Sequence, residues 1–124
     1  MKVPSAVYER IESYCKKLEK YPKLAELYRN CYPNTLETTI KEKDDGGIFV
    51  LTGDIPAMWL RDSTAQVSHY LPLASEDGKT RNIIKGVIKT QFDCILKDPY
   101  ANAFNEAANS HGHTDDIPQN SPWV

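Results

Sequence analysis

The chain has 124 residues, 40% hydrophobic and 26% charged, which is the composition of an ordinary soluble globular domain. Its formal charge is −2, from 15 basic and 17 acidic residues mixed along the chain, so no basic stripe predicts nucleic acid as a partner. No run approaches the ~20 apolar residues of a membrane helix, and the first residues lack the apolar core of a signal peptide. We therefore expect a cytoplasmic protein without membrane contact.

The three cysteines, Cys15, Cys31 and Cys94, are odd in number and widely spaced. They lack the close pairs of zinc ligands and the even count of a disulfide framework. We interpret them as reduced, small, buried apolar residues.

The first third of the chain predicts two helices. The apolar stripe of the first helix has steps of four and three residues and consists of Val7, Ile11, Tyr14, Leu18 and Tyr21. Pro22 can open the second helix, and Pro33 breaks its pattern. The apolar residues of this second helix are Leu24, Leu27, Tyr28 and Cys31. Residues 34–40 fit either one more helical turn or the entry to a strand.

A small β-hairpin is predicted near residues 38–52. Residues 41–47 end in Asp-Asp-Gly-Gly, a turn signal, and the β-favouring run 48–51 follows. After it, Asp54 can cap a helix that Pro56 helps to start, and this helix should contain Trp59 and end near Pro72.

The strongest helical pattern is the next one, which ends at Asp98-Pro99. Its apolar or partly apolar positions are Ile83, Ile84, Val87, Ile88, Gln91, Phe92, Ile95 and Leu96. Residues 100–124 have little apolar periodicity and are expected to form a loop of the long kind that is often functional. The predicted fold class is therefore all-α with one β-hairpin.

The segment from Thr52 to Ser63 is the most informative for function. Arg61 and Asp62 stand beside Trp59 in the apolar start of a helix, where charges cost free energy unless they are paired or used. A carboxylate and a guanidinium bind neighbouring hydroxyls, and an indole covers a sugar face, so these groups indicate a monosaccharide pocket. The structural alternative is that Arg61 pairs with Asp62 or Asp54 and ties a loop to a helix.

Two further polar clusters follow. The first, residues 98–106, includes Asn102 and Asn105 and suits a ligand rich in hydroxyls, or else an Asn-rich loop that caps a helix. The second, residues 111–116, contains His111 and His113, which could converge on a divalent metal ion. A solvated loop at the edge of a sugar site explains the same residues.

Carboxylates that could act in glycoside hydrolysis are numerous. The reaction usually needs two of them, ~6.5–9.5 Å apart for inversion or ~5–5.5 Å for retention. The candidates are Asp54, Asp62, Asp98, Glu106, Asp115 and Asp116. Spacing along the chain does not show which of them face each other, so the residues alone indicate a polar pocket that can hold a sugar.

Three ordered motifs carry a family resemblance. The string TGDIPAMWLRDSTAQVSHY at residues 52–70 resembles the signature of glycoside hydrolase family 125, the metal-independent exo-acting α-mannosidases that prefer α-1,6 linkages. Residues 31–39 are similar to the upstream segment of that family, and residues 98–105 to its downstream segment. The resemblance covers the chain from about Val7 onward.

The resemblance implies a fold, a reaction and a set of binding residues. Family members form an (α/α)6 barrel of six helical hairpins and invert the anomeric centre without a metal, so no cofactor is expected. The string Trp59-Leu60-Arg61-Asp62-Ser63 is also similar to one in glucoamylases of the same barrel, which implies that Arg61 and Asp62 hold the terminal sugar. A mannose-containing oligosaccharide is then the expected partner. The implied substrate-binding residues are Asp54, Trp59, Arg61, Asp62, Asn102, Asn105 and His113.

Length is where the chain departs from the family, whose members are several times longer. The resemblance places the catalytic acid and base beyond Val124, so residues 1–124 are expected to be the amino-terminal part of one catalytic domain, inactive alone. Part of the stripe on the last helix should then stay exposed or be covered by a second copy. The alternatives are a carbohydrate-binding module without hydrolysis, a decayed enzyme, and a small metal-binding domain built on His111 and His113.

Overall fold

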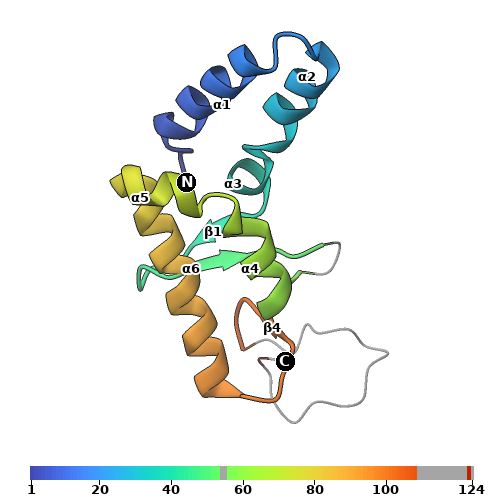
Figure 1. Ribbon diagram of the computed structural model, residues 1–124. Helices are drawn as coiled ribbons and strands as arrows, with labels where there is room; N and C mark the ends of the chain where they lie inside the picture. The colour runs from blue at the N-terminus through green and yellow to red at the C-terminus, as the bar shows by residue number, and fades with distance from the viewer. Residues whose placement is uncertain (54–55, 109–122, 124) are drawn as a thin grey trace.

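The computed structural model describes residues 1–53, 56–108 and 123 and consists mostly of helices with two small antiparallel sheets (Figure 1). The helices are α1 (Ser5–Lys17), α2 (Pro22–Cys31), α3 (Asn34–Thr38), α4 (Leu60–Ser68), α5 (Leu71–Glu76) and α6 (Gly78–Lys97). The strands are β1 (Ile40–Glu42), β2 (Ile48–Val50), β3 (Ala57–Trp59) and β4 (Ala103–Asn105). The first two predicted helices, the β-hairpin and the strong helix before Pro99 are confirmed. These residues do not close a barrel by themselves, so the six-hairpin barrel stays a prediction.

Helices α1 and α2 form a hairpin that extends away from the rest of the structure (Figure 1). Only the amino-terminal part of the α1 stripe is buried, at Val7 and Ile11, and α2 has no buried residue. Tyr14 of α1 stacks on Tyr28 of α2 with ring centroids 5.5 Å apart, which links the two helices. Tyr28 also stacks on Tyr32 at the carboxyl end of α2, at 4.9 Å. The apolar face of α2 is therefore largely uncovered.

The cysteines are free, as expected, but not all are buried. Cys94 is buried, Cys15 is intermediate and Cys31 is exposed. The prediction of three buried cysteines is wrong for Cys31 because α2 packs on α1 alone over most of its length.

The predicted hairpin consists of β1 and β2, in a register that pairs Ile40 with Val50 and Glu42 with Ile48. Gly46 has φ +79° in the connecting turn, a conformation that favours glycine. Strand β2 is fully buried, and α6 packs against it closely, since a Cβ at Gly86 would lie 2.7 Å from Ile48 Cγ1. The sheet is thus fixed against the longest helix.

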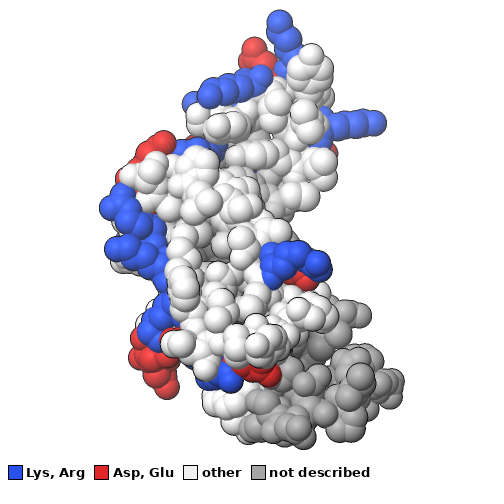
Figure 2. Space-filling view, turned by 60° about the horizontal axis from the view of Figure 1, so that its bottom comes forward, with Lys and Arg blue, Asp and Glu red and all other residues white. Residues whose placement is uncertain are grey.

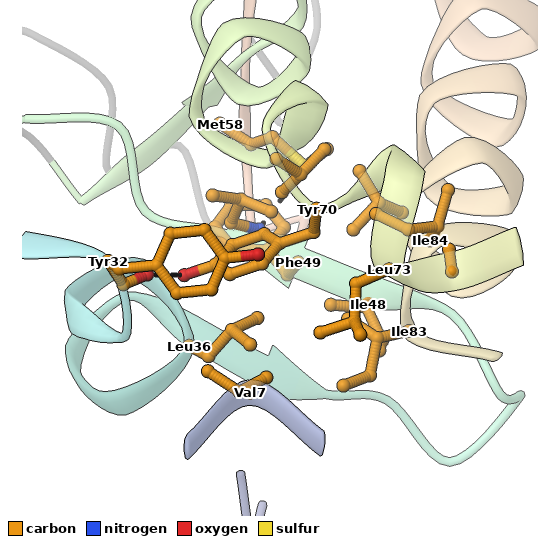
Figure 3. Packing of buried hydrophobic residues seen from close by; sticks show 14 of the residues in the cluster. Val7, Tyr32, Leu36, Ile48, Phe49, Met58, Tyr70, Leu73, Ile83 and Ile84 are labelled. Atoms are coloured by element: carbon orange, nitrogen blue, oxygen red, sulfur yellow. Dashed lines mark hydrogen bonds between the residues drawn. The ribbon is translucent and has the colours of Figure 1, made fainter. Parts of the chain in front are cut away.

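The core lies where α1, α3, the β1–β2 sheet, α4, α5 and α6 meet (Figure 3). At its centre Tyr70 is fully buried, and its hydroxyl donates a hydrogen bond to the backbone carbonyl of Tyr32. Burial strongly raises the pKa of Tyr70, which keeps the phenol protonated and able to donate. This contact joins the carboxyl end of α4 to the α2–α3 connection.

The region between Pro56 and Gly78 differs from the single predicted helix. Residues 57–59 form strand β3, α4 ends at Ser68, and Pro72 lies in the first turn of α5 instead of ending a helix. A proline fits that position because the N–H it lacks has no partner in a first turn. Strand β4 also lies inside the expected loop, so the all-α prediction with a single hairpin missed a second sheet.

Figure 2 shows one face of the molecule, with Lys and Arg side chains gathered along its edge and acidic side chains beside some of them. The centre of this face is largely uncharged. Within the described ranges, no helix is both long and apolar enough to cross a bilayer.

Candidate functional site

Strands β3 and β4 bring two of the sequence clusters together. Ala57 pairs with Asn105 and Trp59 with Ala103 in an antiparallel ladder. Beyond the ladder, the N–H of Leu60 donates to the carbonyl of Asn102 over 3.1 Å. The Trp59–Asp62 segment and the Asn102–Asn105 segment, about 40 residues apart in sequence, therefore share one small region, as a joint binding site requires.

A threonine hydroxyl fixes the strand that leads into this region. Thr52 Oγ1 accepts a hydrogen bond from the N–H of Trp59 over 2.9 Å and donates to the carbonyl of Ala57 over 3.1 Å. Thr52 is itself buried, so water competes little for these bonds. The backbone of Trp59 is held on both edges, by Thr52 on one side and by β4 on the other.

Gln91 fixes the other side of the region from α6. Its Nε2 lies 2.9 Å from Ser63 Oγ, 2.8 Å from Thr64 Oγ1 and 3.3 Å from the carbonyl oxygen of Leu60. Both hydroxyls in turn donate to that carbonyl, over 3.0 and 2.9 Å. One amide thus anchors the first turn of α4, the turn that presents Arg61 and Asp62.

Arg61 and Asp62 form an ion pair of 3.2 Å between Nε and Oδ1, with 85% and 44% of their side chains exposed. The partners are adjacent in sequence, so this pair ties no loop to the helix, and an exposed pair adds little to stability. The structural alternative based on Asp62 therefore explains nothing about the fold. A guanidinium and a carboxylate remain side by side on a rigid turn, open to a ligand.

The other predicted binding residues lie at different depths. Trp59 is partly buried, Asn102 is exposed and Asn105 is buried at 5% exposure. The N–H of Asn105 donates to the carbonyl of Trp123 over 2.7 Å, and Lys97 Nζ lies 3.5 Å from the centroid of the Trp123 ring. Asn105 therefore lies in the buried part of this region, whereas Trp59 and Asn102 lie closer to its surface.

Two of the candidate carboxylates have structural partners. Glu106 pairs with Lys41 over 2.6 Å, and Asp98 Oδ1 accepts the N–H of Tyr100 over 2.9 Å just after α6. The Asp98 contact fixes the turn after α6, but it satisfies no carbonyl of the helix end, so it does not test the capping alternative. The remaining candidates, Asp54, His111, His113, Asp115 and Asp116, lie outside the described residues. In the described part of the chain, no group of three or more His, Cys, Asp or Glu residues could hold a metal ion.

Sequence reasoning missed several side chains around this region. Thr52 and Gln91 act through hydrogen bonds that link distant segments, and no spacing rule reveals them. Gln66 follows Asp62 by one turn within α4, where helical periodicity could have placed both on one side of the helix. His69 lies just beyond the end of α4, beside Tyr32 and Tyr70. Burial lowers the pKa of His69, with a hydrogen bond to the Tyr32 backbone acting in the opposite direction, and its ring lies 5.3 Å from that of Tyr32.

Comparisons with known proteins agree with this arrangement. The family model described as metal-independent alpha-mannosidase (GH125) matches residues 21–123. A solved Streptococcus pneumoniae structure, from a new family of metal-independent alpha mannosidases, is a non-productive substrate complex with alpha-1,6-mannobiose. It is 41% identical, with a TM-score of 0.89, and the match covers 98% of this chain and 29% of that one.

A curated relative, the meiotically up-regulated gene 157 protein of Schizosaccharomyces pombe, is 39% identical over 122 residues. That match covers 90% of this chain and 24% of the relative, so the chain spans about a quarter of the relative's length. With the family model matching most of its residues, the chain belongs to glycoside hydrolase family 125, the metal-independent alpha-mannosidases.

Proposed function

We propose that the chain supplies part of the terminal-mannose binding site of an exo-acting α-1,6-mannosidase that inverts the anomeric centre without a metal. The exposed Arg61–Asp62 pair on the turn fixed by Gln91 is the observation that carries this proposal. The pair has no structural task, yet the surrounding hydrogen bonds hold its backbone in place. Preorganisation of that kind lowers the cost of binding a ligand.

The chemistry of the side chains suits a monosaccharide. The Asp62 carboxylate can accept hydrogen bonds from hydroxyls, and the Arg61 guanidinium can donate to hydroxyl oxygens. Trp59 supplies an aromatic face for the C–H groups of the ring. The α-1,6 preference is supported by the disaccharide bound to the Streptococcus pneumoniae relative.

The role proposed for these residues is binding, not acid or base catalysis. Inversion needs two opposed carboxylates with room for a water between them. Asp98 and Glu106 have other partners among the described residues, so we assign neither of them as the acid or the base. Residues of the Trp59–Asp62 segment would hold the terminal sugar so that groups elsewhere can act on its glycosidic bond.

Binding of α-1,6-mannobiose to the complete gene product tests the proposal, by calorimetry on the natural protein and on Asp62→Asn. Loss of the charge weakens hydrogen bonds from hydroxyls by ~1.5–3 kcal/mol each, so affinity should fall roughly tenfold to a hundredfold or more. Asp44→Asn is the matched control, because Asp44 is exposed on the β1–β2 turn. Equal affinity for Asp62→Asn and the control, with both proteins folded, would remove Asp62 from the site.

Turnover distinguishes the proposal from a carbohydrate-binding module. Release of mannose from α-1,6-mannobiose, with the product first appearing as the opposite anomer, is expected of the complete gene product. Binding without any release would support the module instead.

A further inference from the structure

Gln66 lies one helical turn after Asp62 on the same side of α4. One face of α4 is buried and contains Ser63 and Val67, and the face that contains Arg61 is exposed. Asp62 and Gln66 lie at the boundary between these two faces. Both residues are of intermediate burial. A ligand held by Asp62 therefore has Gln66 as its next neighbour along the helix.

The side-chain oxygen of Gln66 lacks a hydrogen-bond donor in the described part of the chain. This atom, Oε1, is buried. A buried polar atom without a partner costs free energy, and almost all such atoms in folded proteins have one. Gln91 differs from Gln66 in this respect. Its Nε2 lies within hydrogen-bond distance of three acceptors in the first turn of α4.

We propose that Gln66 is a ligand-contacting residue of the sugar site, and that a hydroxyl of the bound saccharide completes its hydrogen bonding. This inference rests on the proposed function and extends it by one residue. A hydroxyl both donates and accepts, so it satisfies the amide whichever of its two polar atoms faces the site. One helical turn rises about 5.4 Å, and a pyranose ring with its hydroxyls spans a similar length.

A ligand-binding role and a structural role predict opposite effects on stability. Gln66→Met keeps the length of the side chain and a similar helix propensity but removes the unsatisfied polar atom. The unfolding midpoint without ligand should therefore rise. If Gln66 were a structural residue with a partner in the folded protein, the same change would lower the midpoint. Gln91→Met is the matched control, and its midpoint should fall because the Nε2 group of Gln91 donates to hydroxyls of α4.

The experiment measures two quantities on the complete gene product, the urea unfolding midpoint without sugar and the affinity for α-1,6-mannobiose. Gln66→Met should raise the midpoint and weaken binding about three- to tenfold, the effect of one neutral hydrogen bond. A lower midpoint overturns the inference, and so does unchanged affinity.

Asp62→Asn, measured in parallel, separates this inference from the proposed function. If Asp62→Asn loses affinity and Gln66→Met does not, the inference alone is wrong. If Asp62→Asn binds like the natural protein, or if the natural protein does not bind the disaccharide at all, the proposed function fails and the Gln66 contact fails with it.

Discussion

Replacement of Gln91 by methionine should destabilise the protein by an amount that the hydrogen bonds predict. The Nε2 group has two hydrogens, which serve Ser63 Oγ at 2.9 Å, Thr64 Oγ1 at 2.8 Å and the Leu60 carbonyl at 3.3 Å. Gln91→Met retains the length of the side chain and a similar helix propensity, so the two donated hydrogen bonds are the main loss. At ~0.5–1.5 kcal/mol for each neutral bond, the free energy of unfolding should fall by about 1–3 kcal/mol.

Gln91→Met should lower the stability of the first turn of α4 as well as the stability of the whole fold. Urea unfolding gives the change in free energy, and Lys85→Met is the control because Lys85 is an exposed residue of α6. Amide hydrogen exchange should accelerate in the first turn of α4, whereas protection of the buried strand β2 should change only with global stability. An unfolding free energy within about 0.5 kcal/mol of the control, with unchanged exchange in α4, would refute the anchoring role of Gln91.

Three further predictions concern α6: its packing on β2, its amino-terminal cap and its exposed apolar face. Gly86→Ala places a Cβ 2.7 Å from Ile48 Cγ1, so overpacking should lower the unfolding free energy by about 1–3 kcal/mol in urea denaturation, and an unchanged value would contradict the close approach. Asp77→Ala removes the side chain that caps α6, which should cost about 1 kcal/mol near pH 7. Because hydrogen bonds lower the pKa of Asp77, this difference should shrink as pH falls below about 4, and a difference that grew in acid would contradict the sign. Phe92→Lys combined with Leu96→Lys replaces side chains that are 62% and 84% exposed, so any self-association seen by sedimentation should weaken, and persistence of the oligomer would exclude this face.

The local elements were predictable where periodicity or turn chemistry decided them. The stripe from Ile83 to Leu96 indicated α6, and Asp-Asp-Gly-Gly at residues 44–47 indicated the β1–β2 turn. Strands β3 and β4 were not predictable in the same way. Each has three residues, and its pairing depends on a partner more than 40 residues away, which no local pattern reveals.

The candidate site was also only partly predictable from the sequence. Trp59, Arg61 and Asp62 stood out because indole, guanidinium and carboxylate groups in an apolar setting are chemically unusual. The residues that hold this segment in place, Thr52 and Gln91, did not stand out. They are ordinary polar residues whose role depends on contacts between segments that are distant in sequence. The α6 stripe that was expected to stay partly exposed comprises Ile84, Val87, Ile88, Gln91 and Ile95. Ile88 and Ile95 are exposed and Ile84 and Val87 are buried, so its partial exposure is confirmed. Phe92 and Leu96 beside it are exposed as well. Whether a second copy covers that face stays a prediction.

A crystal structure of the complete gene product with α-1,6-mannobiose tests the central claim most directly. The terminal mannose should lie at the start of α4, with its hydroxyls within about 3.2 Å of the Asp62 carboxylate and the Arg61 guanidinium and its ring near Trp59. A disaccharide bound elsewhere, with Arg61 and Asp62 still paired only with each other in solvent, would contradict it.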